Sequence, residues 1–502
     1  MSKSTKAEGR AFINGQYVNS MSGEVFASYS PIDGEFLTNI DACNEQDIHH
    51  AVLGARRSFE SGVWSAMPLQ ERKNVLFKLA DLIIEHEEEL AVLETLDMGK
   101  PVSLCLESDI RGGAHAIRWF AECIDKLYDH MSPNHQGIGM ITREPIGVVG
   151  AITPWNFPFY MAIWKVGSAL AMGNSVVVKP SERASLTTIK LGELAHKAGV
   201  PEGVLQIVPG YGRVAGAALG RHSDVDCISF TGSHTTSREL MKYSSETNGK
   251  PVHIEAGGKT ANIVFKDALN LEEAAQVSAQ AIFYNMGEVC FAGSRLLLPD
   301  DEDFIETFLS KVKNYSEYWQ PYNPLDMQSM AGALVDAAHL QRVENFVQGA
   351  LDQGAQLFTG GKIKHPDSGG YYYEPTILTG VTPDMTIAQE EVFGPVLSVM
   401  TYQDEEDAIR IANGTDYGLA SAIWTGDLNR AHRVSRAMKS GNVWVNCFHG
   451  GDMTMPFGGY KQSGNTRDKA FTGFEKYTQI KSTWIALGLR ILVNVNAHSG
   501  AS

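Results

Sequence analysis

Residues 148–158 read VVGAITPWNFP, and the first five of them form a short apolar run rich in β-branched residues. Similar runs recur at 175–178, 204–208, 227–230 and 263–265, and helix-like segments lie between them at 161–172, 185–198, 213–219 and 235–243. Strands that alternate with helices predict βαβ units and a parallel sheet covered on both faces. Such a sheet binds ligands at the carboxyl ends of its strands, where this chain has short glycine-bearing loops.

A second alternating region extends from residue 272 to 440. Its expected helices are 272–285, 303–315, 331–350 and 404–413, and its expected strands are 295–298, 396–401 and 443–445. Upstream, one helix is predicted over 68–98, between Pro68 and Gly99, and another over 110–128. The sequence therefore predicts an α/β fold of two domains with smaller connecting elements.

The composition is that of an ordinary globular protein. The chain has 502 residues, of which 43% are hydrophobic, and this length suits two to four structural units. A formal net charge of −16 repels phosphate backbones and anionic lipids, so no nucleic-acid or membrane partner is expected. The N-terminal MSKSTKAEGR has no signal-peptide features, and no apolar run reaches the ~18 residues of a membrane span.

The cysteines are widely spaced and form no CxxC pair; they are Cys43, Cys105, Cys123, Cys227, Cys290 and Cys447. This spacing predicts reduced thiols and a cytoplasmic protein rather than a disulfide framework. No metal site is predicted, because the histidines at 49, 50 and 234 lack partners at ligand spacing.

Glycine-bearing turns follow two of the predicted strands, at 209–212 and 230–233. Each is either an ordinary tight turn or a place where backbone N–H groups and a helix N-terminus receive a phosphate. Lys179 and Glu182 follow a third strand, and we expect them at the same sheet edge. An ammonium and a carboxylate placed together suit the two hydroxyls of a ribose.

Three further residues are candidates for chemistry. Cys290 follows a predicted helix and is either a small buried hydrophobe or a thiol exposed to a cleft. Glu255 ends a strand beside two glycines, as a general base or as an exposed turn residue. Asn156 lies between two prolines, where its amide either donates to an oxyanion or closes its own turn.

Seven ordered motifs together resemble the NAD(P)-dependent aldehyde dehydrogenase superfamily over roughly residues 10 to 485. They are TPWNFP at 153–158, KPSE at 179–182, FTGS at 230–233, EAGGK at 255–259, GEVC at 287–290, EVFGPV at 391–396 and PFGGYK at 456–461. The resemblance implies two three-layer α/β domains, one Rossmann-like and NAD-binding and one catalytic, plus a small β element for bridging and oligomerisation. It places the NAD-binding domain at 1–124 and 147–255, the catalytic domain at 256–472, the bridging element at 125–146 and 473–490, and a tail at 491–502.

The resemblance also implies roles. Cys290 is the nucleophile that forms a thiohemiacetal and then a thioester, Asn156 holds the oxyanion, and Glu255 activates water. Lys165 and Asp468 match positions that help to relay the proton. The implied cofactor is NAD, because the charge of Glu182 repels the 2′-phosphate of NADP. NADP remains possible. The implied cofactor residues are Thr153, Trp155, Lys179, Glu182, Gly212, Gly232, Ser233, Glu391 and Phe393.

Within the superfamily, the segments 94–101, 116–119, 255–259 and 451–465 resemble bacterial γ-glutamyl-γ-aminobutyraldehyde and 4-guanidinobutyraldehyde dehydrogenases. The implied substrate is an amino- or guanidino-aldehyde of polyamine catabolism, bound near Phe157, Trp164 and Asp452. Glycines at 112, 113, 450 and 451 are expected to widen the tunnel mouth, and Asp452 then attracts a cationic end. An exposed loop aspartate is the alternative reading.

Several alternatives remain open. They are a broad-specificity aliphatic, aromatic or betaine aldehyde dehydrogenase, a CoA-acylating relative, and a non-catalytic structural relative. The presence of both Cys290 and Glu255 favours a hydrolytic enzyme. Family members assemble as homodimers or homotetramers. Glu288 replaces the commoner glutamine two residues before the nucleophile, and only a small effect is expected because residues two apart on a helix do not face each other.

Overall fold

The computed structural model describes residues 7–133 and 137–487. Its first sheet has seven strands in the order β11-β10-β7-β8-β9-β1-β2. The five from β11 to β9 are parallel, and β1 is antiparallel to β9. The strands are β1 (Ala11–Ile13), β2 (Gln16–Val18), β7 (Val148–Ile152), β8 (Ser175–Lys179), β9 (Leu205–Ile207), β10 (Cys227–Gly232) and β11 (Val252–Ala256).

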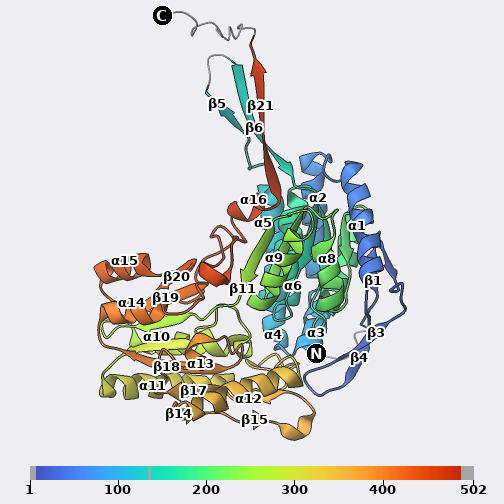
Figure 1. Cartoon of the computed structure of the whole chain (residues 1–502). Coiled ribbons are helices and arrows are strands. Elements are labelled where there is room, and N and C mark those ends of the chain that lie inside the picture. Colours follow the sequence, from blue (N-terminus) through green and yellow to red (C-terminus); the bar gives the residue numbers. More distant parts are fainter. Residues whose placement is uncertain (1–6, 134–136, 488–502) are drawn as a thin grey trace, which may run out of the picture.

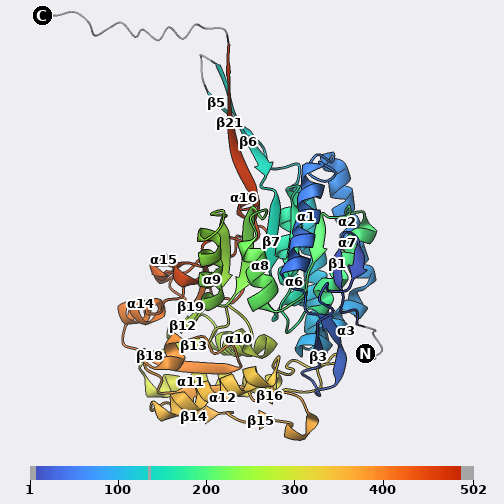
Figure 2. The ribbon, with the colours of Figure 1, turned by 45° about the vertical axis from the view of Figure 1, so that its right-hand side comes forward.

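Helices cover both faces of this sheet (Figures 1 and 2). Val148 and Val177 pack with α1 (Glu45–Glu60), α8 (Ala217–Arg221) and α9 (His234–Ser245). Val149 and Val176 pack with α6 (Pro158–Ala171), α7 (Leu186–Ala198) and the outer α2 (Leu69–Glu85), α3 (Glu87–Met98) and α5 (Gly112–Cys123). Successive residues of each strand face opposite sides of the sheet, and helices cover both sides. These runs are therefore apolar at every position.

The second sheet also has seven strands, in the order β14-β17-β18-β13-β12-β19-β20, and only β14 is antiparallel to its neighbour. Its strands are β12 (Ala261–Val264), β13 (Arg295–Pro299), β14 (Gln356–Thr359), β17 (Thr376–Thr379), β18 (Val396–Tyr402), β19 (Ala420–Trp424) and β20 (Asn442–Val445). Leu296 and Leu298 share one core with α10 (Leu271–Phe283) and α11 (Glu302–Ser316). Leu297 faces α12 (Ala337–Asp352), α13 (Thr386–Gln389), α14 (Glu405–Asn413) and α15 (Leu428–Ala437). The predicted fold of two α/β domains is confirmed.

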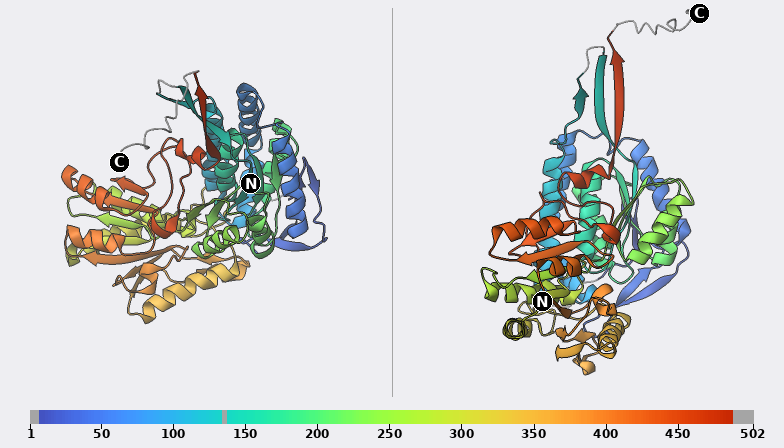
Figure 3. Two further views of the ribbon diagram at one scale, coloured as in Figure 1. Left: turned by 45° about the horizontal axis from the view of Figure 1, so that its top comes forward. Right: turned by 60° about the vertical axis from the view of Figure 1, so that its left-hand side comes forward.

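A three-stranded sheet projects from the body of the molecule (Figures 1 and 3). It consists of β5 (His130–Ser132), β6 (Gly137–Pro145) and β21 (Thr478–Ala486), and β21 follows the short helix α16 (Thr472–Glu475). β21 pairs with β6 along its whole length, from Thr478 opposite Pro145 to Ala486 opposite Gly137. We call this sheet the arm. The expected tail at 491–502 lies outside the described residues.

Small elements complete the described chain. They are the hairpin of β3 (Val25–Tyr29) and β4 (Phe36–Asp41), the pair β15 (Ile363–Lys364) and β16 (Tyr372–Tyr373), and the single turn α4 (Val102–Leu104).

Several sequence predictions were wrong in detail. The helix predicted over 68–98 is two helices, because the chain leaves helical geometry at His86. The helix predicted over 331–350 begins at Ala337, where Asp336 caps it by accepting from the backbone N–H of His339. The strand predicted at 263–265 belongs to the second sheet, as part of β12. The N-terminal strands were not predicted, since short strands at sheet edges carry weak patterns.

Candidate active site

The segment 255–259 is the crossover between the two sheets, because β11 is an edge strand of the first sheet and β12 lies inside the second. Glu255 lies at the carboxyl end of β11. Asn156 follows β7, and Cys290 follows the turn Tyr284–Gly287 at the end of α10. The topology therefore brings the three predicted catalytic residues to one crossover. This agrees with the rule that parallel α/β sheets bind their ligands at the carboxyl ends of the strands.

Two glycines permit the close approach at this crossover. A Cβ on Gly257 would lie 2.3 Å from the Glu391 carboxylate, and a Cβ on Gly258 would lie 2.6 Å from the backbone carbonyl oxygen of Cys290. The backbone N–H of Gly258 also donates to Glu391 Oε1 at 3.2 Å. The glycine pair thus holds the thiol and a predicted cofactor residue against the strand that ends in Glu255.

We expect Gly258→Ala to lower kcat by about 10²-fold, because a displacement of the Cys290 backbone by about 1 Å misaligns the nucleophile. The measurement is the rate of NADH formation, with thermal unfolding monitored in parallel. Gly349→Ala is the matched control, since a Cβ at that helical position meets no atom within 4 Å. Equal kcat for Gly258→Ala and the native protein would show that the close approach of Gly258 to the Cys290 backbone does not contribute to catalysis.

Cys290 is partly exposed, and the two central residues of the turn Tyr284–Gly287 adopt left-handed backbone angles (Asn285 φ 48°, Met286 φ 53°). Such angles are costly for residues other than glycine and occur where a site demands them. Burial raises the pKa of the Cys290 thiol, and the charges of Glu391 and Glu255 raise it further. The thiol therefore needs a nearby base in order to become a nucleophile.

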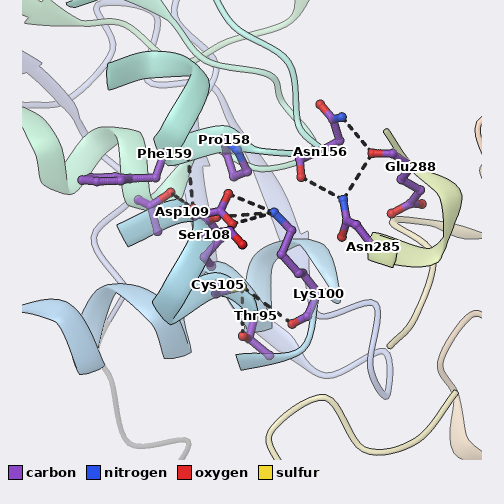
Figure 4. A network of polar contacts seen from close by, with 12 residues as sticks. Thr95, Lys100, Cys105, Ser108, Asp109, Asn156, Pro158, Phe159, Asn285 and Glu288 are labelled. Carbon is purple, nitrogen blue, oxygen red and sulfur yellow. Dashed lines mark hydrogen bonds and ion pairs between the residues drawn. The ribbon is translucent and has the colours of Figure 1, made fainter. Parts of the chain in front are cut away.

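The amide of Asn156 ties the loop after β7 to the cysteine loop. Its Nδ2 donates to the carbonyl oxygen of Glu288 at 2.8 Å, and Asn285 Nδ2 donates to the carbonyl oxygens of Asn156 and Glu288, each at 3.2 Å (Figure 4). The second N–H of the Asn156 amide is left available to a substrate oxyanion. The amide is held in place, which is the condition for oxyanion stabilisation.

A buried charge cluster, which the sequence did not reveal, supports this loop. We define it as Glu94, Lys100 and Asp109. Lys100 Nζ donates to Asp109 Oδ1 at 2.9 Å and Oδ2 at 3.0 Å, and lies 4.0 Å from Glu94 Oε1 (Figure 4). Glu94 Oε2 accepts from the backbone N–H of Phe159, next to Pro158 at the start of α6. Lys100 Nζ lies 3.7 Å from the centre of the Phe157 ring. The cluster fixes the segment that carries Asn156.

Glu255 lies among buried charges. Neither of its carboxylate oxygens has a hydrogen-bond partner within the described chain. Burial raises the pKa of Glu255 well above its ordinary value, and the charge of Asp468 raises it further. Lys165 Nζ lies 3.7 Å from Asp468 Oδ2, so the structure brings both predicted relay residues together. Lys476, which the sequence did not single out, donates to Asp468 Oδ1.

The predicted ribose-binding pair forms at the end of β8. Lys179 Nζ donates to Glu182 Oε2 at 2.8 Å, and the backbone N–H of Gly212 donates to Glu182 Oε1 at 3.3 Å. Gly232 ends β10, and Ser233 caps α9 by accepting from the N–H of Thr236. These positions fit a dinucleotide, with the ribose at the lysine–glutamate pair and the phosphates at the start of α9.

Trp155 and Phe393 are two further predicted cofactor residues, and Phe393 lies two residues after Glu391. Burial raises the pKa of Glu391 to about 7. Trp155 packs edge-on against Phe393 at 5.3 Å between ring centres. The backbone of Phe393 is left-handed (φ 63°), and its carbonyl oxygen accepts from His339 Nε2 at 2.7 Å. Thr153, before this loop, has a buried Oγ1 with no partner among the described residues. An unpartnered buried hydroxyl beside a strained loop fits the binding of a polar ligand such as a dinucleotide.

The predicted substrate residues divide into two groups. Trp164 is edge-on to Tyr160 at 5.1 Å and to Phe457 at 5.6 Å, while Phe291, next to the nucleophile, lies 5.8 Å from Phe457 and 4.4 Å from His449. We call these five residues the aromatic cluster. The Phe157 ring instead packs on Lys100 and stacks with Tyr284 at 6.4 Å.

Asp452 is exposed, and its Oδ1 accepts from the hydroxyl and the backbone N–H of Thr454 at 2.6 and 2.8 Å. These bonds, together with the charge of Lys469, lower the pKa of Asp452. Gly113 does not widen a mouth as expected, because it is buried in the contact between α5 and α6 with Phe159 3.1 Å from its would-be Cβ. A helix contact requires a small residue there for packing.

Glu288 is fully buried, but it does not lie on a helix as assumed. Its Oε1 accepts from the N–H of Val335 at 3.1 Å and lies 3.6 Å from His339 Nε2. Burial raises the pKa of Glu288 well above the ordinary value. The raised pKa favours an uncharged Glu288, and its hydrogen bond goes to Val335 and not to the Cys290 thiol. In both respects Glu288 resembles a glutamine at this position.

Within residues 7–133 and 137–487, no group of three or more His, Cys, Asp or Glu side chains is arranged to hold a metal. Over the same residues, no helix combines the length and apolar character that crossing a bilayer requires.

Comparison with known proteins identifies the class. The aldehyde dehydrogenase family matches residues 17–483, so the chain belongs to this family. NADP/NAD-dependent aldehyde dehydrogenase PuuC of Escherichia coli is 48% identical over 482 residues, which cover 96% of each chain. Aminoacetaldehyde dehydrogenase of Pseudomonas aeruginosa is 45% identical over 478 residues, which cover 95% of each chain.

A solved structure is equally similar. γ-Glutamyl-γ-aminobutyraldehyde dehydrogenase from Burkholderia cenocepacia superposes with a TM-score of 0.94 at 49% identity, covering 96% of this chain and 97% of that one. The predicted class, an NAD(P)-dependent aldehyde dehydrogenase, is therefore confirmed, as is the resemblance to a bacterial γ-glutamyl-γ-aminobutyraldehyde dehydrogenase.

Proposed function

We propose that the protein oxidises an aldehyde to the free carboxylic acid through a covalent intermediate on Cys290. The observation that carries this proposal is the meeting of Cys290, Asn156 and Glu255 at the crossover between the two sheets. The net reaction converts aldehyde, NAD and water into carboxylic acid, NADH and a proton.

The residues act in order. Glu255 accepts the thiol proton as the sulfur of Cys290 attacks the aldehyde carbon, and the Asn156 amide holds the resulting oxyanion. The cofactor supplies the hydride acceptor, a role that no side chain can fill. This first proton leaves Glu255 for solvent and is the proton of the net reaction. Glu255 then takes a proton from water as that water attacks the thioester, and the Cys290 thiolate leaves. Because Glu255 is present at this position, we propose hydrolysis rather than acyl transfer to CoA.

The cofactor site favours NAD over NADP. The Glu182 carboxylate is held at the ribose position by Lys179 and by the N–H of Gly212, and its charge repels a 2′-phosphate. PuuC is named as using both cofactors, so we propose that NAD is preferred here and that NADP is also accepted. We also propose a cytoplasmic location, from the cysteine spacing, and a homodimer or homotetramer joined through the arm. The arm exposes Met131, Ile480 and Trp484.

For the substrate, we propose an amino- or guanidino-aldehyde of polyamine catabolism. Two relatives are named for aldehydes that carry amino groups. Asp452 supplies an ionised, exposed carboxylate for a cationic far end. The test is a comparison of kcat/KM for 3-aminopropanal, γ-glutamylaminobutyraldehyde, guanidinobutyraldehyde, betaine aldehyde and a neutral aliphatic aldehyde.

We expect Asp452→Asn to raise KM for the cationic aldehydes by about fivefold at most, because an exposed charge interaction is screened by solvent. The KM of the neutral aldehyde should not change, and Asp427→Asn, a helix cap in α15, is the matched control. A native preference for the neutral aldehyde would defeat the proposed substrate class.

A neutral aromatic aldehyde is the second candidate substrate. The aromatic cluster favours it, because Phe291 adjoins the nucleophile and stacks on His449 with ring planes 22° apart. A planar ring gains from such edge and face contacts. Inclusion of phenylacetaldehyde in the same comparison distinguishes the two.

A further inference from the structure

Among the described residues, four charged side chains act on Glu255, namely Asp468, Lys476, Lys165 and Arg467, and the catalytic assignment accounts for Asp468 and Lys165. Lys165 projects from α6 and Asp468 precedes α16, while Lys476 follows α16 at the root of the arm. Lys476 is buried, with only 6% of its surface exposed. A buried ammonium costs several kcal/mol unless it is paired, so its position requires an explanation.

The two lysines share one carboxylate unequally. Lys476 donates a hydrogen bond to Asp468 Oδ1, whereas Lys165 Nζ lies 3.7 Å from Oδ2, beyond hydrogen-bond distance. The charge of Asp468 is therefore compensated first by Lys476. Lys165 is buried, and it is therefore only weakly paired with Asp468 and repelled by the charge of Lys476.

The protonation states follow from this arrangement. Burial lowers the pKa of Lys165 to about 8, and the repulsion from Lys476 contributes to the lowering against the attraction of Asp468. Lys476 itself has a raised pKa, because the attraction of Asp468 outweighs its burial. Lys476 therefore stays charged, whereas Lys165 loses its proton more readily than an ordinary lysine does.

We propose that Lys476 is a positioning residue that occupies Asp468 and thereby keeps Lys165 free to take up the proton which Glu255 removes from water. This inference rests on the proposed hydrolytic function. The proton moves from the Glu255 carboxyl to the neutral Lys165 amine, which restores the carboxylate for the next turnover. Without Lys476, Asp468 would pair with Lys165 and hold it in the ammonium form.

The charge of Lys476 lowers the pKa of each titratable neighbour named here, whatever the net shift of that group. The charge of Lys476 lowers the pKa of Glu255 as well as that of Lys165. His253 of β11 is neutral, because burial and then Lys476 lower its pKa to about 4. Arg467 also acts on Glu255, and the Tyr477 ring lies 5.2 Å from Lys476 Nζ. Removal of Lys476 therefore raises the pKa of both the base and the lysine that receives its proton.

The test is the pH profile of kcat for Lys476→Met. We expect the acid limb to move upward by about one pH unit, so that kcat falls about tenfold at pH 7 and approaches the native value above pH 9. The pre-steady-state burst of NADH should become larger relative to turnover, because acylation does not use this proton path. Lys476→Arg retains the charge and should restore the native profile.

Two variants separate this effect from damage to the fold. Lys481→Met removes an exposed lysine of β21 and should leave the profile unchanged. The double variant Asp468→Asn with Lys476→Met removes both charges, so its acid limb should lie at or below the native position even if Lys476→Met folds poorly. An acid limb for Lys476→Met that superimposes on the native one overturns the inference, and so does a double variant whose limb stays raised. The proposed function fails separately, by activity that survives Cys290→Ala.

Discussion

Replacement of Cys290 by alanine is expected to lower NADH formation from any aldehyde by at least about 10⁴-fold, since loss of a covalent nucleophile has effects of this order. The thiol stands beside Asn156 and Glu255 at the crossover between the sheets, and the five other cysteines lie elsewhere. The measurement is initial NADH production without CoA. Cys447→Ser, at an exposed thiol, is the control and should be fully active.

Glu255→Gln distinguishes the two chemical steps in the same assay. The variant should form one equivalent of NADH at a reduced rate and then turn over about 10² to 10⁴ times more slowly, because water attack has lost its general base. A non-catalytic relative would show no activity in the native protein. A CoA-acylating enzyme would need CoA for turnover, and Cys290→Ala activity near the native level would contradict the covalent mechanism.

The second large effect concerns stability. Lys100→Met is expected to lower the free energy of unfolding by about 3–5 kcal/mol, because it leaves the Asp109 carboxylate buried without its cation. All three members of the buried charge cluster are fully inaccessible. The urea midpoint of unfolding measures the loss, and kcat should fall as well, because the segment 156–159 rests on the cluster.

Glu94→Gln is the matched variant for this prediction. Burial raises the pKa of Glu94 well above its ordinary value and so favours the protonated side chain, and glutamine has the same shape and charge as that form. A folded pKa above the unfolded one makes the native protein lose stability as pH rises past the unfolded value. The stability of Glu94→Gln relative to the native protein should therefore increase with pH. A loss as large as that of Lys100→Met would show that Glu94 is ionised.

Much of the fold could be predicted because parallel strands buried on both faces are marked by continuous apolar runs. The strand at 148–152 was predicted with its observed bounds, and the catalytic residues came from motifs with characteristic chemistry. The break at His86 and the capping of α12 by Asp336 depend on local geometry that periodicity does not record.

The supporting residues were harder to predict for a physical reason. Lys100, Asp109 and Lys476 look like surface residues in the sequence, since charged side chains are usually exposed. Only tertiary contacts between distant segments show that each is paired in the interior. Segment 94–101 carries part of the family resemblance, and the structure shows that its Lys100 packs on the Phe157 ring, next to Asn156.

The return of the C-terminal segment to the first domain has a consequence for biosynthesis. The carbonyl oxygen of Tyr477 accepts from Asn174 and from the backbone of Ile146, and its hydroxyl donates to Ser229. A nascent chain can assemble the dinucleotide domain long before residues 457–477 leave the ribosome. Such a chain has Cys290, Glu255 and Lys165 but lacks Asp468 and Lys476. On the proposed mechanism, a chain that ends before residue 457 is therefore expected to lack the residues that pair with Lys165 and complete the proton path from Glu255.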